Sequence, residues 1–584
     1  MSAEENEKKS NLIEKELIQS PGRTALANFL SNRLAIIGMA MFTFIFVSCF
    51  LLSIIFPLDI NHADSSQQHI APGLNLMRLP RELRDAGVKM IDTGMSFSAG
   101  VDINNNVYVW GRPTQEALLE IPANMGNIVK ISCGMDHILA LNDQGQVFTW
   151  GNNRHQLAMI PEQVRRANIT HIAAGVQISL AADDTNTIHV WGNRGIKDIR
   201  PELFEGEVKQ IVLNDTTGFI VTTDNRLYAL SARDVLVVSG IPAWIQGQVQ
   251  SIAVTNRDGM ALLTDGSVVP WGNNLNGEHN IPQKIQGRTV AIEAGTTHFT
   301  ALLDDGTVAA WGLNFYSQAS VPRRLAGIQS IYSGYFQNFA IDIDGRVHTW
   351  GLHGYIMGTD DFGRDIFRRL LEGGKITLTV GAIAIIISSI IGITIGGISG
   401  FFHGKVDLLL MRLGEVVSSI PFLPIVIILS VVVGNRLPDE ARLIMIMCVL
   451  GFLSWPGIAR ITRGQILVER EKEFVTAAKA LGVRERVIIF KHILPNILPV
   501  ILVNVTLGLA GIMLFEAGLS FLGFGVMPPA PSWGNMLQGF TSIVIRLYWW
   551  RWVFPALTLS LAVISISMIG DALRDAIDPK SNSR

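Results

Sequence analysis

The chain has 584 residues, of which 48% are apolar and only 16% are charged, and its mean hydropathy is +0.33. Because soluble domains carry about 25% charged residues, this composition excludes an ordinary soluble protein. A formal net charge of −2 excludes the basic footprint of a nucleic-acid-binding protein, so no nucleic-acid partner is expected, and three cysteines exclude a disulfide framework.

The chain begins with a polar, charged segment that leads into an apolar one. Residues 1–32 are predicted to form a cytoplasmic tail. Residues 34–56 carry no charge, and 23 such residues are long enough to cross about 30 Å of hydrocarbon. This run is too long for the core of a signal peptide, and no small-residue cleavage site follows it. We therefore predict a first transmembrane helix at residues 33–57.

Five more apolar runs follow, after about 300 residues that contain none long enough to span a membrane. They lie at residues 376–397, 416–434, 443–458, 497–522 and 553–569. Together the runs predict a polytopic α-helical membrane domain of six transmembrane helices, with five of them in a core at residues 373–580. Eight lysines and arginines between residues 460 and 491 predict a cytoplasmic loop. Counting spans from that loop places both termini inside the cell and residues 58–372 outside.

Trp-Gly pairs recur through the outer segment. Their tryptophans, which are separated by 40, 41, 80, 40 and 39 residues, are Trp110, Trp150, Trp191, Trp271, Trp311 and Trp350. The double gap contains a degenerate copy, "DNRLYALS", with Leu230 in the place of tryptophan. Turn signals such as Asp-Gly between alternating apolar residues are typical of β-hairpins. The sequence thus predicts seven units of about 40 residues, a period typical of a β-propeller or a solenoid.

Topology favours the closed form of this repeat. A propeller brings its first and last blades together, as insertion into a loop requires, whereas an open solenoid separates its ends and needs polar caps. We predict an all-β, seven-bladed propeller at residues 76–351, inserted in the first extracytoplasmic loop. The recurring pattern "AGxxHxxAL…DGxVxxWGxN…VP" resembles regulator-of-chromosome-condensation (RCC) repeats.

A charged segment connects the repeats to the second apolar run. We predict an amphipathic helix on the outer surface at residues 355–372. Its candidate functional residues are Asp360, Asp361, Gly363, Arg364 and Asp365. The structural alternative is a salt-linked collar, because acids near the start of a helix complement its dipole.

The predicted cytoplasmic loop, residues 460–495, carries a second pattern. Glu473, Ala477, Ala478 and Gly482 are followed by a Leu-Pro pair that ends at Pro495. The small alanines permit close approach of a partner, and Gly482 is suited to end a short helix. A plain amphipathic connector would explain the charges but not these spacings. The pattern resembles the "EAA" loop of ATP-binding cassette (ABC) importer permeases, where a short helix docks on the cytoplasmic ATPase.

Other stretches resemble one branch of those permeases. "MGTDDFGRDIF", "EAGLSFLGFG" and "PPAPSWGNML", which contains Trp533, are similar to the dipeptide/oligopeptide/nickel permease family, as are "NRLAIIGMAMFTF" and "GDALRDAIDP". The resemblance implies the ABC importer permease fold and the second, "C"-type, of two paired permeases. The propeller departs from the family pattern of a modest outer loop.

The resemblance also implies a function. The chain would form the translocation pathway for small peptides, in a prokaryotic cell membrane. The implied partners are a second permease subunit, two ATPase subunits that bind ATP and Mg²⁺, and an extracytoplasmic solute-binding protein. This sequence has no G-x-x-x-x-G-K-[ST] phosphate loop, so we expect no catalytic residue, cofactor or metal in the chain itself.

Two alternatives to peptide import remain open at this point. The chain could be a membrane-anchored propeller for adhesion, partner binding or inhibition, although one helix would suffice as an anchor. It could also import nickel or another small solute.

Two acids in the apolar runs are candidates for a pathway or gate. Glu516 lies about twenty residues into the run at 497–522, and Glu415 precedes the run at 416–434. A carboxylate inside a membrane is costly, so it is by default a functional hypothesis. The alternative is that Glu516 sits near the outer mouth and that Glu415 is interfacial.

Overall fold

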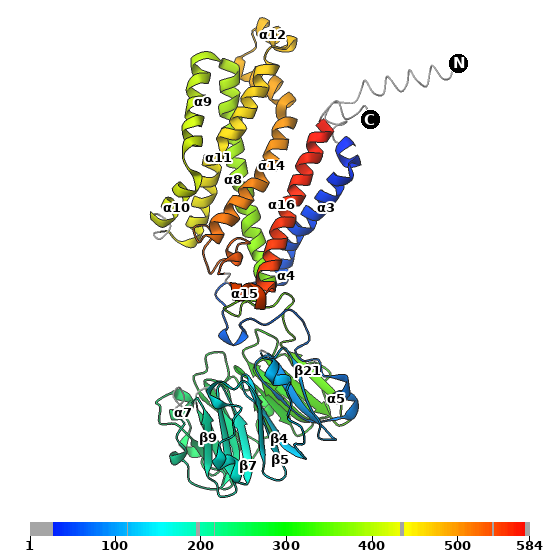
Figure 1. The fold of residues 1–584 in the computed structure, drawn as a ribbon, viewed down its shortest axis with the longest axis vertical. Coiled ribbons are helices and arrows are strands. Elements are labelled where there is room, and N and C mark those ends of the chain that lie inside the picture. Colours follow the sequence, from blue (N-terminus) through cyan, green and yellow to red (C-terminus); the bar gives the residue numbers. More distant parts are fainter. Residues whose placement is uncertain are drawn as a thin grey trace, which may run out of the picture. The chain divides into compact units, whose positions relative to one another are not determined.

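The computed structural model describes residues 27–113, 115–193, 199–214, 217–432, 437–539 and 542–577. The chain divides into two compact units (Figure 1). A helical unit comprises Met1–Ala63 and Arg364–Arg584, and a β unit comprises Asp64–Gly363. Residues 1–26 of the predicted tail and residues 578–580 of the predicted core lie outside the described residues.

The described residues of the β unit form 21 strands in seven antiparallel sheets, each made of three consecutive strands. The first four sheets are β1 (Val88–Thr93), β2 (Phe97–Asp102), β3 (Val107–Gly111); β4 (Ile128–Cys133), β5 (His137–Asn142), β6 (Val147–Gly151); β7 (Ile169–Ala174), β8 (Ile178–Asp183), β9 (Ile188–Gly192); and β10 (Val208–Leu213), β11 (Gly218–Thr222), β12 (Leu227–Ala229). The last three are β13 (Val249–Val254), β14 (Asp258–Leu263), β15 (Val268–Gly272); β16 (Thr289–Ala294), β17 (His298–Leu303), β18 (Val308–Gly312); and β19 (Ile328–Gly334), β20 (Gln337–Asp342), β21 (Val347–Gly351).

The sheets close into a ring. Their first strands contact one another in the order β1, β4, β7, β10, β13, β16 and β19, and β19 contacts β1. Trp110 of the first blade meets Phe339 of the last edge to face, with ring centroids 6.0 Å apart. The predicted seven-bladed propeller is therefore confirmed. Short helical turns between blades include α5 (Arg81–Ala86), α6 (Glu162–Arg166) and α7 (Leu236–Ser239).

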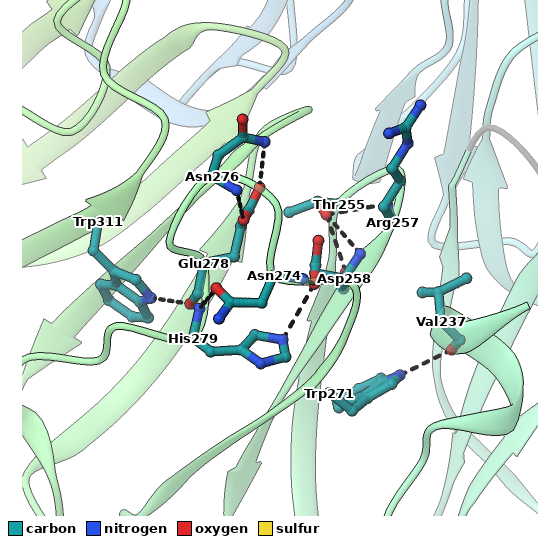
Figure 2. Close-up of polar contacts among 10 residues, drawn as sticks. All are labelled: Val237, Thr255, Arg257, Asp258, Trp271, Asn274, Asn276, Glu278, His279 and Trp311. Carbon is teal, nitrogen blue, oxygen red and sulfur yellow. Dashed lines mark hydrogen bonds and ion pairs between the residues drawn. The ribbon is translucent and has the colours of Figure 1, made fainter.

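The repeated tryptophans are buried where one blade meets the next. Figure 2 shows two of these corners: the indole Nε1 of Trp271 donates to the carbonyl of Val237 (2.9 Å), and that of Trp311 donates to the carbonyl of Glu278 (2.8 Å). Each indole thus buries a large apolar surface and also satisfies a carbonyl of the preceding loop. In the degenerate fourth unit Leu230 fills the tryptophan position and is fully buried.

The two chain segments that flank the ring are hydrogen-bonded to each other. Gly73 and Tyr355 form an antiparallel bridge with N–H···O distances of 2.8 and 3.0 Å. The hydroxyl of Thr359 donates to the carbonyl of Gln67 (2.6 Å) and accepts from the N–H of Ile70 (2.8 Å). We call these two paired segments, residues 67–73 and 355–360, the neck. Because of the neck, the chain leaves and re-enters the ring at one place.

The helical unit is built from long apolar helices. Their bounds are α3 (Arg33–Val47), continued by the π-helical turn η1 (Ser48–Leu52) and α4 (Ser53–Ile55); α8 (Ile366–Phe402); α9 (Gly404–Ser419); α10 (Phe422–Val432); α11 (Asp439–Glu469); α12 (Glu473–Ala480); α13 (Glu485–Val487) with the π-helical η9 (Ile488–Ile493); α14 (Leu494–Phe521); α15 (Ser542–Leu547); and α16 (Trp550–Ile577). In the described part of the chain, five helices are long and apolar enough to cross a membrane, or six if the bent pair α9 and α10 is one span.

Two predicted boundaries differ from the structure. The amphipathic helix predicted at residues 355–372 does not exist as a separate element, because residues 355–365 form bridges, bends and a turn without any helix, and α8 begins at Ile366. Asp365 caps α8 by accepting from the N–H of Phe367 (2.9 Å), which fixes the start of the helix there. The third span, predicted at residues 416–434, is bent by 73° between α9 and α10. Pro421 lies at this break and disfavours a continuous helix.

Helices α8 and α11 pack closely through small residues. Gly392, Gly396 and Gly400 recur every fourth position on the face of α8 that meets α11. A Cβ atom on Gly400 would lie 2.9 Å from the carbonyl oxygen of Arg463, and one on Gly396 would collide with the carbonyl oxygen of Ala459. Small residues let helix backbones approach where apolar surroundings supply no hydrophobic driving force.

Replacing Gly396 with alanine is expected to lower the free energy of unfolding of the helical unit by about 1–3 kcal/mol, because the added methyl group must push α11 away. Gly464→Ala is the matched control, since its Cβ would meet nothing within 4 Å. It should leave stability unchanged or slightly raised. Thermal unfolding of the detergent-solubilised chain measures both. Equal effects of the two substitutions would contradict close packing at Gly396.

Candidate functional site

The predicted coupling loop forms a short helix with a defined end. Helix α12 contains Glu473, Ala477 and Ala478, and Gly482 follows its last turn with φ of +73°. The N–H of Gly482 donates to the carbonyl of Lys479 (3.0 Å), and that of Val483 donates to the carbonyl of Ala478 (3.1 Å). This pair of bonds is a Schellman motif, which glycine completes without steric cost. Downstream, Pro495 lies in the first turn of α14.

One face of α12 is fixed to the ends of the long helices. Val475 and Ala478 are 0% and 8% exposed, in a cluster with Phe401 at the end of α8 and isoleucines of η9 and α14. The ammonium of Lys479 lies 5.0 Å from the centroid of the Phe401 ring. The guanidinium of Arg470 donates to the carbonyl of Phe401 (3.2 Å). Displacement of α12 would therefore act directly on α8 and α14.

A neighbouring face of α12 is exposed and partly apolar. Leu481 is 83% exposed and Phe474 is 38% exposed, and Ala477 lies between them. These three residues, spaced by three and four positions, form a stripe along the helix that we call the exposed stripe. Glu473 is exposed beside it. Helix α12 lies at the end of the helical unit opposite to α15 (Figure 1). An apolar stripe on a polar, projecting helix is suited to a protein partner.

An ion pair with a buried carboxylate joins the helices next to α12. Asp407 of α9 accepts two hydrogen bonds from the guanidinium of Arg463 of α11 (2.5 and 2.6 Å) and one from the hydroxyl of Ser399 of α8 (2.5 Å). The sequence did not predict this interaction between Asp407, Arg463 and Ser399, which we call the Asp407 clamp. The one indication in the sequence is that Asp407 lies among apolar residues, in "KVDLLL". Its partner Arg463 is 56 positions away, so the pairing could not be predicted.

Glu516 lies inside the helical unit. It is 0% exposed, and its carboxylate accepts from the hydroxyl of Ser520 (2.7 Å). Trp533, also predicted as a site residue, is fully buried nearby: its indole donates to the carbonyl of Leu370 (3.0 Å) and its N–H to the hydroxyl of Thr377 (3.3 Å). The motif segments around Glu516 and Trp533 therefore pack together against α8, and neither side chain lines an open path in this structure.

The other predicted acids lie at helix surfaces and turns. Glu415 is exposed on α9 and pairs with Arg412 at 2.7 Å. In the neck, the carboxylate of Asp360 accepts from the N–H of Phe362 (2.9 Å), and the N–H of Gly363 donates to the carbonyl of Asp360 (3.1 Å).

Asp361 and Arg364 belong to the same turn region of the chain, and Asp365 is the N-cap of α8 described above. The group is therefore distributed over a tight turn and a helix cap rather than along one helix face.

Comparison with family models divides the chain as the fold does. Residues 392–583 match the binding-protein-dependent transport system inner membrane component, and residues 20–72 match the N-terminal transmembrane domain of oligopeptide transport permease C. Residues 128–156 and 290–318 match the regulator of chromosome condensation (RCC1) repeat.

Curated relatives match the membrane part. The oligopeptide transport system permease protein OppC of Haemophilus influenzae is 43% identical over 230 residues, which are 39% of this chain and 72% of that protein. The dipeptide transport system permease protein DppC of Bacillus subtilis is 40% identical over 223 residues, 38% of this chain and 68% of that protein. A putative peptide permease protein of Brucella suis is 40% identical over 225 residues, 38% of this chain and 72% of that protein.

Two solved structures each match less than half of this chain. The WD40 ectodomain of the Arabidopsis thaliana receptor kinase ACR4 is 16% identical and covers 46% of this chain and 98% of its own, with a TM-score of 0.37. The MetNI methionine ABC transporter is 21% identical and covers 36% of this chain and 96% of its own, with a TM-score of 0.29.

The family is shown by the curated relatives, because this chain covers most of their length. At about 40% identity over 72% of their length, and with five to six apolar helices here, this chain is a multi-pass inner-membrane protein. It belongs to the family of binding-protein-dependent transport permeases, together with the dipeptide and oligopeptide permease proteins, and it carries an RCC-type seven-bladed propeller between its first two apolar helices.

Proposed function

We propose that this chain is the second permease subunit of an ABC importer and helps to form the translocation pathway for small peptides delivered by a solute-binding protein. The observation that carries the proposal is α12. It presents the exposed stripe outward, while Val475 and Ala478 fasten it to α8 and α14. A helix with one free apolar face and one fixed face is suited to transmit a push from a partner. The names of the relatives support peptides as the cargo.

The mechanism follows from these contacts. A cytoplasmic ATPase subunit grips the exposed stripe, and closure of the ATPase pair on ATP displaces α12. The contact of Lys479 with Phe401 and the packing of Val475 and Ala478 in the same cluster transfer that displacement to the end of α8. Because α8 packs on α11 along the glycine face, both helices move together. ATP and Mg²⁺ belong to the two ATPase subunits, and this chain is a transport subunit that performs no catalysis itself.

The proposed orientation places α12 and both termini in the cytoplasm and the propeller outside. The cluster of lysines and arginines around α12 supports this orientation through the positive-inside rule. The remaining partners are then a second permease subunit beside the helical unit, and a solute-binding protein on the side of the propeller.

The proposal is tested by reconstituting the chain with a second permease, two ATPases and a solute-binding protein in lipid vesicles. We expect labelled peptides, added with the binding protein, to accumulate inside only when ATP is present with the ATPases. Uptake of Ni²⁺ without uptake of peptides would replace the proposed cargo. Failure of ATPase subunits to co-purify with the solubilised chain would contradict the importer itself and favour a membrane-anchored adhesion propeller.

A further inference from the structure

The propeller encloses a cavity of about 600 Å³ along its axis, lined by the first strands of the blades. This volume is within the usual range for small-molecule sites, about 300–1,000 Å³. It lies wholly inside the β unit, and the proposed transport function does not use it.

The strand register shows which side chains share one level of this cavity. Asp92 of β1 pairs with Ala99, Glu293 of β16 pairs with Thr300, and Ala253 of β13 pairs with Met260, each at the third position of a middle strand. On this level the two acids come from the first and sixth blades, which flank the seventh. The opposite wall is aliphatic and consists of Ala173, Val212 and Ala253 from the third to fifth blades.

The two acids differ in how they are bonded. Asp92 accepts from the backbone N–H groups of Thr93 (2.9 Å) and Cys133 (2.8 Å), so it fastens the first blade to the second. Among the described residues, no hydrogen bond or ion pair engages the carboxylate of Glu293. Glutamate is one methylene longer than aspartate and reaches further from its strand. Glu293 is therefore an acceptor that the propeller itself leaves unused.

A second polar group in the cavity also lacks a partner. The side chain of Thr93 is only 4% exposed, yet its hydroxyl has no hydrogen-bond partner. Both Thr93 and the neighbouring Gly334 line the cavity. This hydroxyl has no exposed surface and lies against Gly334, between the first and last blades, so it is not available to a ligand and Glu293 is the acceptor that the cavity offers.

The charged side chains that line the cavity indicate which class of ligand it would bind. Burial raises the pKa of Glu293 to about 7; the ammonium of Lys130 opposes this rise and the nearby Asp92 adds to it. Two lysines also line the cavity, but neither shares this level: Lys130 pairs with Leu141, two positions from the level residue Ser132, and the ammonium of Lys209 donates to the side-chain oxygen of Asn225 (2.8 Å). The level of Asp92 and Glu293 therefore carries an excess of acceptors when Glu293 is ionised. A small aliphatic wall opposite an acidic one fits an alkyl chain that ends in a positive nitrogen.

We propose that the axial cavity of the propeller binds a primary alkylammonium group, held by the carboxylate of Glu293 with its alkyl chain against Ala173, Val212 and Ala253. Lysine side chains of peptides and free aliphatic diamines share this chemistry. The proposal does not depend on whether the chain transports peptides.

The test uses the full chain in detergent micelles and isothermal titration calorimetry. The probes are 1,5-diaminopentane and the blocked peptide acetyl-Gly-Lys-Gly-amide, with 1,5-pentanediol as the uncharged control. We expect one or both amines to bind and the diol not to bind. Binding of the diamine alone identifies a free amine as the ligand, and binding of the peptide identifies a lysine side chain. Absence of heat with both amines up to about 10 mM, weaker than any Kd of functional interest, would overturn the proposal.

Two substitutions with opposite expected effects locate the site. Glu293→Gln should weaken amine binding at least tenfold, whereas Lys130→Ala should tighten it because a competing cation is removed. Glu120→Gln, at an exposed glutamate outside the cavity, should change nothing. Unchanged affinity in both cavity variants would contradict the assignment even if the amines bind elsewhere.

The pH dependence supplies an independent readout. The groups that face Glu293 are Asp92, Lys130 and Tyr332, with His298 on the paired strand β17. Burial lowers the pKa of His298 to about 4, so it stays neutral near pH 7. Amine affinity should rise about tenfold between pH 6 and pH 8 as Glu293 ionises, and Glu293→Gln should remove this dependence. An affinity that falls over this range would contradict the role of Glu293.

Discussion

Replacing Leu481 with aspartate is expected to abolish co-purification of the ATPase subunits and to reduce ATP-driven uptake at least about tenfold. Leu481 is 83% exposed at the end of the exposed stripe, so a buried interface with a partner would have to enclose the new charge. The free energy of unfolding of the isolated chain should change by less than about 0.5 kcal/mol, because the side chain contacts little in this unit. Pull-down of the ATPases and vesicle uptake measure the two effects.

Thr476→Asp provides the matched control. Thr476 is also exposed on α12 but lies outside the exposed stripe, so it receives the same charge without entering the proposed interface. Uptake should remain near that of the unmodified chain. If both substitutions reduce uptake equally, any negative charge added to α12 has this effect, and the exposed stripe is not the docking surface.

Replacing Asp407 with alanine is expected to lower the free energy of unfolding of the helical unit by about 1–3 kcal/mol, because the partly buried guanidinium of Arg463 and the hydroxyl of Ser399 lose their acceptor. Asp407 is 7% exposed and binds Arg463 and Ser399, so one side chain connects α9 with α11 and α8. Thermal unfolding in detergent measures the loss. Because these helices end beside α12, we also expect uptake to fall in the fraction that remains folded.

The same helix offers the control for this prediction. Glu415 on α9 pairs with Arg412 at 2.7 Å, but both side chains are more than half exposed. Glu415→Ala should therefore cost less than about 1 kcal/mol. The double substitution Asp407→Ala with Arg463→Ala should cost clearly less than the sum of the single ones, since no unpaired charge remains buried. Additive losses would show that the two groups do not stabilise each other.

The neck explains how a permease loop accommodates a propeller of this size. Residues on both sides of the ring, such as Gly73 and Tyr355, are hydrogen-bonded to each other before the chain re-enters the helical unit. The two ends of the inserted propeller therefore lie next to each other, as insertion into a loop requires. The segment that begins α8 keeps its own capping residue, Asp365, so the start of that helix does not depend on the insert.

Local sequence patterns determined much of this protein. A run of apolar residues is a property of neighbours in sequence, so the membrane-crossing helices could be predicted before the structure was known. Six of the seven blades could be recognised from a tryptophan and a set of turns repeated about every 40 residues, and the fourth, with Leu230 in the tryptophan position, from the double gap that it fills. The short helix α12 was predicted from Ala477, Ala478 and Gly482, whose spacing encodes a short helix and its end.

Tertiary packing decided the rest, because it joins residues whose separation in sequence carries no signal. The ring closes because β19 contacts β1. The Asp407 clamp forms because Asp407 of α9 meets Arg463 of α11 and Ser399 of α8. The axial cavity brings together Asp92, Lys130 and Glu293 from three blades, and no local sequence pattern indicates that these three positions meet. Helix α8 begins at Ile366 and not at residue 355 because Asp365 caps it there, and the third span is bent at Pro421. Hydropathy did not predict either feature, because it does not measure capping hydrogen bonds or the effect of proline on the backbone.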